Sequence, residues 1–443
     1  MNAPSDLRRR AWRWHFIAAV LVIPFVLWQS LTGTLYLWSE HWVDARHAEL
    51  RFVEPGARRV ALDAQVDAAR AFHAGRGVAA IRVPADPARS TQVMFNDAPG
   101  LPLAAFVDPY RGVLLGSLEG SGWPVGWSRS LHGGWPLGDA GSWLLEIGAS
   151  WTIVMVLTGL VLWWPRDGRG LRAVLPRVRS GRHVLWRDLH ACAAVWCSLL
   201  IVLFLFSALP WTSFWGGWIL QPARQALGQQ GPAAAGFAPV FAGSGTAHGP
   251  RLQTMLDTAR AQGLDGDLLI TMVDGPPGSA VSIRQLKPRA SQERALLLDR
   301  GSAGVLANVG WEAFPPLAKA VATGVDIHEA AYFGRVGPWI NTLFALALAW
   351  LCITGLVSWW TRKPAASTGI PPGVRAPWPW WLRMASLALF ALLPLLALSA
   401  ALLWLLERMA ARLQRPDAAP VDRPAPSHPD ASGTGFAPEG DSR

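Results

Sequence analysis

The pattern of hydrophobic and polar positions divides the chain into long apolar stretches separated by polar segments. A membrane-spanning helix needs about 20 predominantly apolar residues. Five stretches meet this length, and they cover residues 14–38, 139–164, 187–211, 337–360 and 380–406. Residues 1–38 therefore form the N-terminus and first span, and 407–443 form a tail whose Pro/Ala/Asp/Ser composition is typical of disorder.

The short connections between spans carry most of the arginines. The segment before residue 14, the connection 165–186 and the connection 361–379 are all arginine-rich. Positive connections face the cytoplasm, so we expect an inner-membrane protein with a cytoplasmic N-terminus. The first apolar run is too long for a signal peptide and is interpreted as an uncleaved span.

The two long segments, 39–138 and 212–336, would then lie in the periplasm, and each has the pattern of a small α+β domain. An amphipathic helix is predicted first in each segment, followed by short alternating strands. The helices are predicted at 61–72 and 251–262. The strands are predicted at 80–83, 91–95 and 104–107, and at 268–273 and 280–284, and each segment closes with a strand–turn–strand, at 106–116 and 297–306.

Composition excludes several classes of protein. Hydrophobic residues make up 51% of the 443 residues and charged residues only 16%, which is unusual for a soluble protein. The net charge of +10 is concentrated beside the apolar stretches, so the expected partner is membrane lipid and no nucleic acid. The three cysteines all lie inside apolar runs and form no CxxC motif, which argues against disulfides, a zinc ribbon and covalently attached haem.

An internal repeat organises the chain. Residues 132–164 align without a gap with residues 328–360, and eleven of 33 positions are identical. A shorter match at an offset of 175 pairs His15-x-x-Ala-Ala-Val with His190-x-x-Ala-Ala-Val. The unit span–domain–span therefore occurs twice in the same sense, as a parallel duplication, and a fifth span follows. Equivalent residues of the two copies must then lie at equal depth.

The repeat places four histidines in two pairs. His15 and His190 would lie near the cytoplasmic ends of spans, and His132 and His328 at the periplasmic mouths. Histidines within spans are costly and usually functional, and a bis-His b-type haem takes one imidazole from each of two facing helices. We therefore expect two haem b groups in series. Interfacial histidines bonded to headgroups, or a bare metal site, are the alternatives.

Neighbouring residues complete the predicted site. Arg13 and Arg187 flank the cytoplasmic pair, and Arg129 precedes His132, so each is a candidate partner for a haem propionate. The positive-inside rule explains Arg13 and Arg187 equally well. Three Thr-Gly dipeptides, beginning at residues 32, 158 and 354, break the span interiors. Close helix packing is the default interpretation, and a haem face approaching the glycine is the alternative.

Several of these motifs resemble a known family, the PepSY-associated transmembrane proteins. They are Trp12-Arg-Trp-His15 with Pro24-Phe25 and Leu31-Thr-Gly33, Leu157-Thr-Gly-Leu-x-x-Trp-Trp-Pro-Arg166, Arg187-Asp-Leu-His190, His328-Glu329 with Phe333-Gly334, and Thr354-Gly-x-x-x-Trp-Trp360. The Asp108-Pro-Tyr-Arg-Gly112 turn is similar to the end of a PepSY domain. The resemblance covers roughly residues 8–365, with Ser207-Ala208 as a departure where Thr-Gly is expected.

The resemblance implies an α-helical polytopic membrane protein with two small PepSY-like periplasmic domains. It further implies iron acquisition, haem ligation by His15, His190, His132 and His328, and ferrisiderophore reductase activity. We expect a di-haem oxidoreductase that passes electrons from a quinol or a cytoplasmic reductase to a periplasmic ferric chelate. Two other functions fit the same pattern: a non-enzymatic protein that binds a periplasmic partner, and a permease for iron or its chelate.

Overall fold

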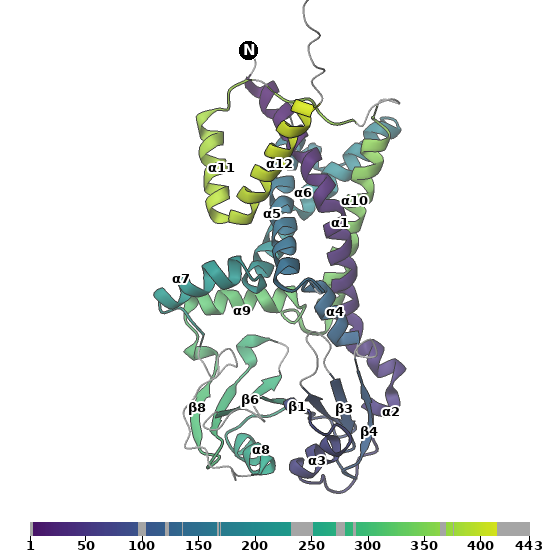
Figure 1. Cartoon of the computed structure of the whole chain (residues 1–443). Coiled ribbons are helices and arrows are strands. Elements are labelled where there is room, and N and C mark those ends of the chain that lie inside the picture. The colour runs from purple at the N-terminus through teal and green to yellow at the C-terminus, as the bar shows by residue number, and fades with distance from the viewer. Residues whose placement is uncertain are drawn as a thin grey trace, which may run out of the picture. The chain divides into compact units, whose positions relative to one another are not determined.

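The structure is a computed structural model of the whole chain (Figure 1). The residues that it describes are 3–95, 103–119, 124–134, 136–165, 168, 170–231, 251–271, 280–286, 289–363, 369–374 and 376–413. Backbone contacts divide the chain into a large compact unit, Met1–Leu396, and a second unit that begins at Ala397.

Four long apolar helices form the membrane-spanning part of the large unit. They are α1 (Ala3–Arg46), α5 (Gly138–Trp163), α6 (Arg182–Ala208), which a 3-10 turn η3 (Leu209–Trp211) extends, and α10 (Gly337–Trp360). The helices follow the predicted spans, although α1 extends well beyond 14–38 at both ends. Pro24 lies inside α1 without ending it.

The predicted fifth span is not one straight helix. The structure has two helices there, α11 (Trp380–Leu392) and α12 (Pro394–Leu413), bent by 118° at Leu393. Pro394 has no N–H for the helix ladder and restricts the residue before it to extended backbone, and Leu393 accordingly has φ −128° and ψ 78°. Residues 407–413, which the sequence predicts as the start of a disordered tail, are helical, and the rest of that tail lies outside the described residues.

Two helices outside the spans were not predicted. Helix α4 (Pro124–His132) precedes α5, and α9 (Pro316–His328) precedes α10. Each ends at one of the predicted haem-ligand histidines, so His132 and His328 belong to separate short helices that precede the spans. The chain then turns through Gly134 in one half and Ala330 in the other, both with positive φ. The smaller helical elements are α2 (Ala48–Arg51), η2 (Gly170–Val174), the π-helix η4 (Trp215–Leu220), α7 (Gln221–Ala226), η6 (Ala290–Gln292), η7 (Trp311–Ala313) and η8 (Gly334–Val336).

The strands of the two long segments form one continuous antiparallel sheet. Its eight strands have the order β4-β3-β2-β1-β5-β6-β7-β8. The bounds are β1 (Val78–Val83), β2 (Thr91–Phe95), β3 (Leu103–Val107), β4 (Leu114–Leu118), β5 (Asp267–Thr271), β6 (Ala280–Leu286), β7 (Ala295–Asp299) and β8 (Val305–Val309). Two separate domains were predicted, but β1 and β5 pair across the middle, with Ile81 opposite Ile270. An edge strand carries unpaired N–H and C=O groups, and here each half covers the other's edge.

The core of this sheet also joins the two halves. Helices α3 (Leu62–Phe72) and α8 (Leu252–Ala261) contribute Val66 and Met255 to the same apolar cluster as Ile81 and Ile270. Each of these side chains is at most 2% exposed. Fully burying one such side chain stabilises a fold by about 1.5–3 kcal/mol. The shared cluster therefore makes the junction between β1 and β5, which we call the seam, part of the hydrophobic core.

The first span is tied to the sheet by a cluster of ion pairs around the buried Arg51. Arg51 is only 2% exposed, and its Nε donates to Asp44 Oδ1 at 2.7 Å while its other end contacts Glu40. Arg89 donates to the same Asp44 carboxylate, at 2.7 Å, and this partner raises the pKa of the Arg89 guanidinium. A buried guanidinium is tolerated only when paired, so this cluster fixes how α1 leaves the membrane.

We predict that the seam can be captured covalently. Cα atoms of directly opposite residues in antiparallel strands lie about 4.5–5.5 Å apart, within the range that a disulfide can bridge. The double variant Ala80→Cys/Thr271→Cys, whose positions are opposite in β1 and β5, should form a disulfide on mild oxidation. Mass spectrometry of peptides from the non-reduced protein measures it.

The matched control places the second cysteine one strand further away. Ser282 on β6 is the partner of Thr271, so it lies about 10 Å from Ala80. The variant Ala80→Cys/Ser282→Cys should stay reduced. Equal cross-linking of both variants would contradict a fixed β1–β5 pairing.

Candidate functional site

The four predicted histidines form two close pairs. His15 on α1 faces His190 on α6, with 6.4 Å between ring centroids and an interplanar angle of 76°. His132 at the end of α4 faces His328 at the end of α9, with 6.1 Å between ring centroids and an angle of 54°. We call the second pair the sheet-side pair, because α4 and α9 follow the last strands of the two halves of the sheet, β4 and β8. We call the first pair the distal pair.

Each histidine of the distal pair is held by a threonine of a neighbouring span. His15 Nδ1 lies 3.2 Å from Thr158 Oγ1 on α5. His190 Nδ1 lies 3.3 Å from Thr354 Oγ1 on α10. The same nitrogens also lie 3.0 and 3.1 Å from the backbone carbonyl three residues before each threonine.

The sheet-side pair repeats this arrangement. His132 Nδ1 lies 3.0 Å from Thr32 Oγ1 on α1, and His328 Nδ1 lies 3.1 Å from Ser207 Oγ on α6. The backbone of the residue three positions earlier, Gln29 or Phe204, also hydrogen-bonds the ring. All four imidazoles therefore occupy the same kind of seat, formed by a hydroxyl and by a backbone carbonyl one helical turn before it.

The hydroxyls decide which ring nitrogen carries the proton. Each of the four hydroxyls donates its own hydrogen to a carbonyl three or four residues earlier in its helix, at 2.7 to 2.9 Å. Each is then free to accept, and the backbone carbonyl beside each ring can only accept, so the imidazole donates through Nδ1–H. The lone pair of Nε2 is left free, which is the state in which a histidine binds a metal.

Glycines beside three of these hydroxyls make room for the rings. A Cβ added to Gly159 or Gly355 would lie 3.2 Å from Cε1 of His15 or His190, and one on Gly33 would lie 3.0 Å from Cε1 of His132. The Thr-Gly dipeptides, whose default interpretation was helix packing, thus contact the candidate ligands directly. At the fourth seat the chain has Ala208 in place of glycine.

The spacing of the pairs suits one iron between two imidazoles. Iron–nitrogen bonds of about 2 Å on each side put the two ring centroids about 6 Å apart, close to the 6.4 and 6.1 Å observed. Among the described residues, no group of three or more His, Cys, Asp or Glu side chains could hold a metal ion. Two imidazoles leave an ion short of donors, so the donor set fits a metal that brings its own macrocycle, as in haem, better than a bare ion.

The sheet-side pair is neutral at physiological pH. Helices α4 and α9 lie outside the candidate spans, and burial lowers the pKa of His132 and of His328 to about 4. The neighbouring Glu329 is also desolvated, which raises the pKa of its carboxyl.

The predicted arginines differ in their contacts. Arg187 pairs with Asp188 at 2.9 Å, and Arg13 donates to the carbonyl of Pro371 at 2.6 Å. Arg129 lies over the Trp211 ring, 5.8 Å from its centroid. Sequence reasoning missed Arg362, which follows α10 and whose charge acts on both distal histidines. No motif marks it, because it resembles any other arginine of a short connection.

A buried carboxylate also lies in the spans. Glu146 on α5 is fully buried, and its Oε2 accepts the backbone N–H of Trp215 at 2.9 Å. One turn earlier, Ser142 Oγ accepts the N–H of Ser213 at 2.9 Å. These contacts fix the start of the π-helix η4, so Glu146 holds the turn that follows α6. Sequence analysis did not single out this residue.

These features define a multi-pass membrane protein with two pairs of facing histidines. The family model of the PepSY-associated TM region matches residues 12–362, and the chain belongs to that family. A search of curated proteins finds no match for the sequence.

We predict that replacing the glycine beside one of these histidines with a larger residue lowers the stability of the protein. In Gly355→Val the branched side chain must push the His190 ring away, and overpacking of this kind costs about 1–3 kcal/mol. Thermal unfolding of the chain in detergent measures it. Gly217→Val is the matched control, because a Cβ at Gly217 meets no atom within 4 Å; an equal loss of stability in both variants would contradict the seat.

Proposed function

We propose that this protein is a di-haem inner-membrane reductase that passes electrons across the membrane to a periplasmic ferric chelate, a ferrisiderophore, in iron acquisition. The observation that carries the proposal is the set of two imidazole pairs, 6.4 and 6.1 Å between centroids, with every Nδ1 engaged. Four unrelated interfacial histidines are not expected to have the same set of hydrogen-bond partners, or to face each other in pairs.

His15 with His190 and His132 with His328 would each hold one haem b, which supplies reversible one-electron transfer when bound. The residues of the chain supply position and tuning. The Nδ1 hydrogen bonds to Thr158, Thr354, Thr32 and Ser207 orient the rings and make the free nitrogens better donors. Arg129 and Arg362, with Arg13 and Arg187, are the cations available to propionate groups.

The two levels are far enough apart to carry electrons across most of a bilayer. His15 and Thr32, which seats His132, are separated along α1 by about 25 Å at 1.5 Å per helical residue. The arginine-rich connections favour a cytoplasmic position for the distal pair and a periplasmic position for the sheet. The two histidines of each pair come from equivalent positions of the two repeats and face each other, which supports the parallel duplication. The two halves of the sheet would be PepSY-like domains.

The proposed reaction balances in electrons. A quinol or a reduced cytoplasmic protein gives up electrons at the distal level, and each ferric ion accepts one at the sheet-side level. A quinol releases two electrons and two protons, so it reduces two ferric ions. Ferrous iron binds hard oxygen ligands less strongly because of its lower charge, and the chelate then releases the metal.

We predict that the purified protein absorbs light as a b-type cytochrome with two haems per chain. His15→Ala and His328→Ala should each lose one haem by pyridine haemochrome assay, because an iron with one imidazole is held less firmly. His183→Ala is the control, since His183 is exposed and lies on α6, the helix of His190. A colourless, folded wild-type protein would instead favour a binding module.

We also predict vectorial reduction. The ferric siderophore and a ferrous-iron indicator are placed on one side of a proteoliposome membrane, and a quinol donor is supplied to the membrane. Ferrous iron should form when that side is the one on which the sheet lies. His15→Ala should slow this at least about tenfold, because the distal step is lost. Transport of the intact ferric chelate into the vesicles without any reductant would contradict the reductase and support a permease.

A further inference from the structure

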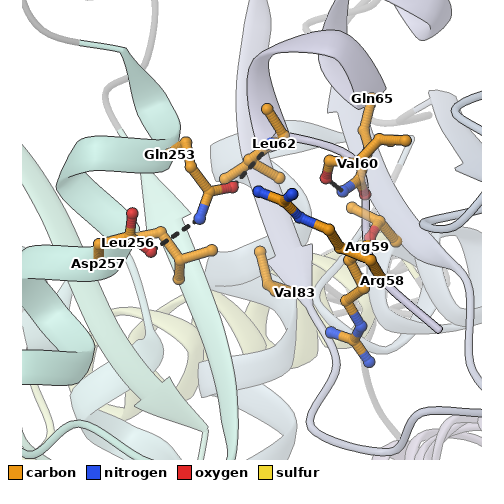
Figure 2. Close-up of a pocket in the computed structure, with 11 residues that line it drawn as sticks. Arg58, Arg59, Val60, Leu62, Gln65, Val83, Gln253, Leu256 and Asp257 are labelled. Atoms are coloured by element: carbon orange, nitrogen blue, oxygen red, sulfur yellow. Dashed lines mark hydrogen bonds between the residues drawn. The ribbon is translucent and has the colours of Figure 1, made fainter.

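The seam of the sheet contains a cavity that the proposed electron path does not use. Its volume is about 360 Å³, within the range of small-molecule sites. It lies on the side of the sheet that α3 and α8 cover, beside Val83 of β1 and Thr91 of β2 (Figure 2). Both halves of the chain contribute walls, so it exists only because β1 and β5 pair.

Reciprocal contacts between the two helix starts give the cavity a fixed shape. Asp63 on α3 accepts the backbone N–H groups of Leu252 and Gln253 at 2.9 and 3.0 Å, at the start of α8. Gln253 in turn accepts the N–H of Leu62, the first residue of α3, at 2.9 Å. The N-termini of both helices are therefore locked together at one end of the cavity.

Two buried polar atoms of the lining have no partner among the described residues. Gln65 is 4% exposed and Thr91 is 1% exposed, yet Gln65 Oε1 and Thr91 Oγ1 make no hydrogen bond. Gln65 Nε2 donates to Val60 O at 2.8 Å, which fixes the amide and leaves Oε1 as a pure acceptor. An unpaired buried acceptor is costly, so the chain does not fully satisfy the polar side chains around this cavity by itself.

Opposite charges line opposite walls. Arg58 and Arg59 lie on one side and Asp257 on the other, with Gln253 between them (Figure 2). Arg59 donates to the carbonyls of Pro84 and Asp86, at 2.9 and 3.3 Å, and neither arginine has a carboxylate within ion-pair distance among the described residues. Within the described part of the chain, Asp257 accepts a hydrogen bond from Gln253 Nε2 alone, at 2.8 Å. The walls between them are apolar, with Val60, Val83 and Leu256.

We propose that this cavity binds a small zwitterion, a free amino acid or a dipeptide, with an apolar side chain. Its carboxylate would face Arg58 and Arg59, its ammonium group would face Asp257, and its side chain would lie against Val83 and Leu256. A simple anion leaves Asp257 unmatched, and a simple cation leaves both arginines unmatched. The proposal does not depend on haem or on reduction.

Isothermal titration of the full chain in detergent tests it with leucine, glycylleucine, N-acetylleucine and leucinamide. Leucine or glycylleucine should bind. Loss of either terminal charge should weaken binding about tenfold or more, as expected for charged hydrogen bonds. In Asp257→Asn, leucine should bind about as weakly as N-acetylleucine does, and in Arg58→Gln about as weakly as leucinamide does.

Matched controls are Arg294→Gln and Asp67→Asn, which remove charges that do not line the cavity; neither should change leucine binding. We expect dissociation constants no weaker than about 1 mM. If neither leucine nor glycylleucine binds at about 10 mM, the proposal is overturned. Equal binding of all four probes overturns it as well, because the cavity then recognises only the apolar group. Binding of phosphate or N-acetylleucine in preference to leucine would show a plain anion site instead.

Discussion

The hydrogen bond from imidazole Nδ1 into a neighbouring helix is the interaction on which the membrane part of this protein depends. Helices in lipid gain no hydrophobic free energy from meeting each other, and an interhelical hydrogen bond contributes roughly 0.6 kcal/mol, up to about 2. Four such bonds do not account for the stability of the bundle. They matter because a hydroxyl whose own hydrogen is already donated can only accept, and this fixes the tautomer of each ring. A modest energy thus determines which nitrogen faces the partner histidine.

The seats also explain why α1 and α6 occupy equivalent places. Helix α1 supplies His15 to the seat on α5 and provides Thr32 as the seat for His132 of α4. Helix α6 supplies His190 to α10 and provides Ser207 for His328 of α9. Each of these two helices therefore carries one of the four histidines and one seat, about 25 Å apart along its axis. A shift of either helix along its axis would disturb both pairs at once, so the two levels are mechanically coupled.

Much of this arrangement could be predicted from the sequence, because apolar length defines spans and a fixed repeat offset pairs His132 with His328. Other parts depend on information that one chain segment does not contain. The β1–β5 pairing joins edges whose partners are about 190 residues apart, and no local pattern distinguishes a covered edge from a free one. Pro24 and Pro394 have the same backbone chemistry, yet only the second ends a helix, since packing around α1 outweighs the lost hydrogen bond. The Thr-Gly dipeptides resemble ordinary packing motifs until the position of each imidazole is known.

The one departure from the repeated seat separates the roles of its two residues. Ser207-Ala208 lacks both the threonine methyl group and the glycine, but Ser207 Oγ still lies 3.1 Å from His328 Nδ1. The ring is supported instead by Phe204, with 4.3 Å between ring centroids and an interplanar angle of 29°. Glycine is therefore needed only where the ring lies against the helix backbone, whereas the hydroxyl is present at all four seats. Because an aromatic face replaces the glycine contact, the imidazole keeps its orientation while the helix that seats it carries a Cβ.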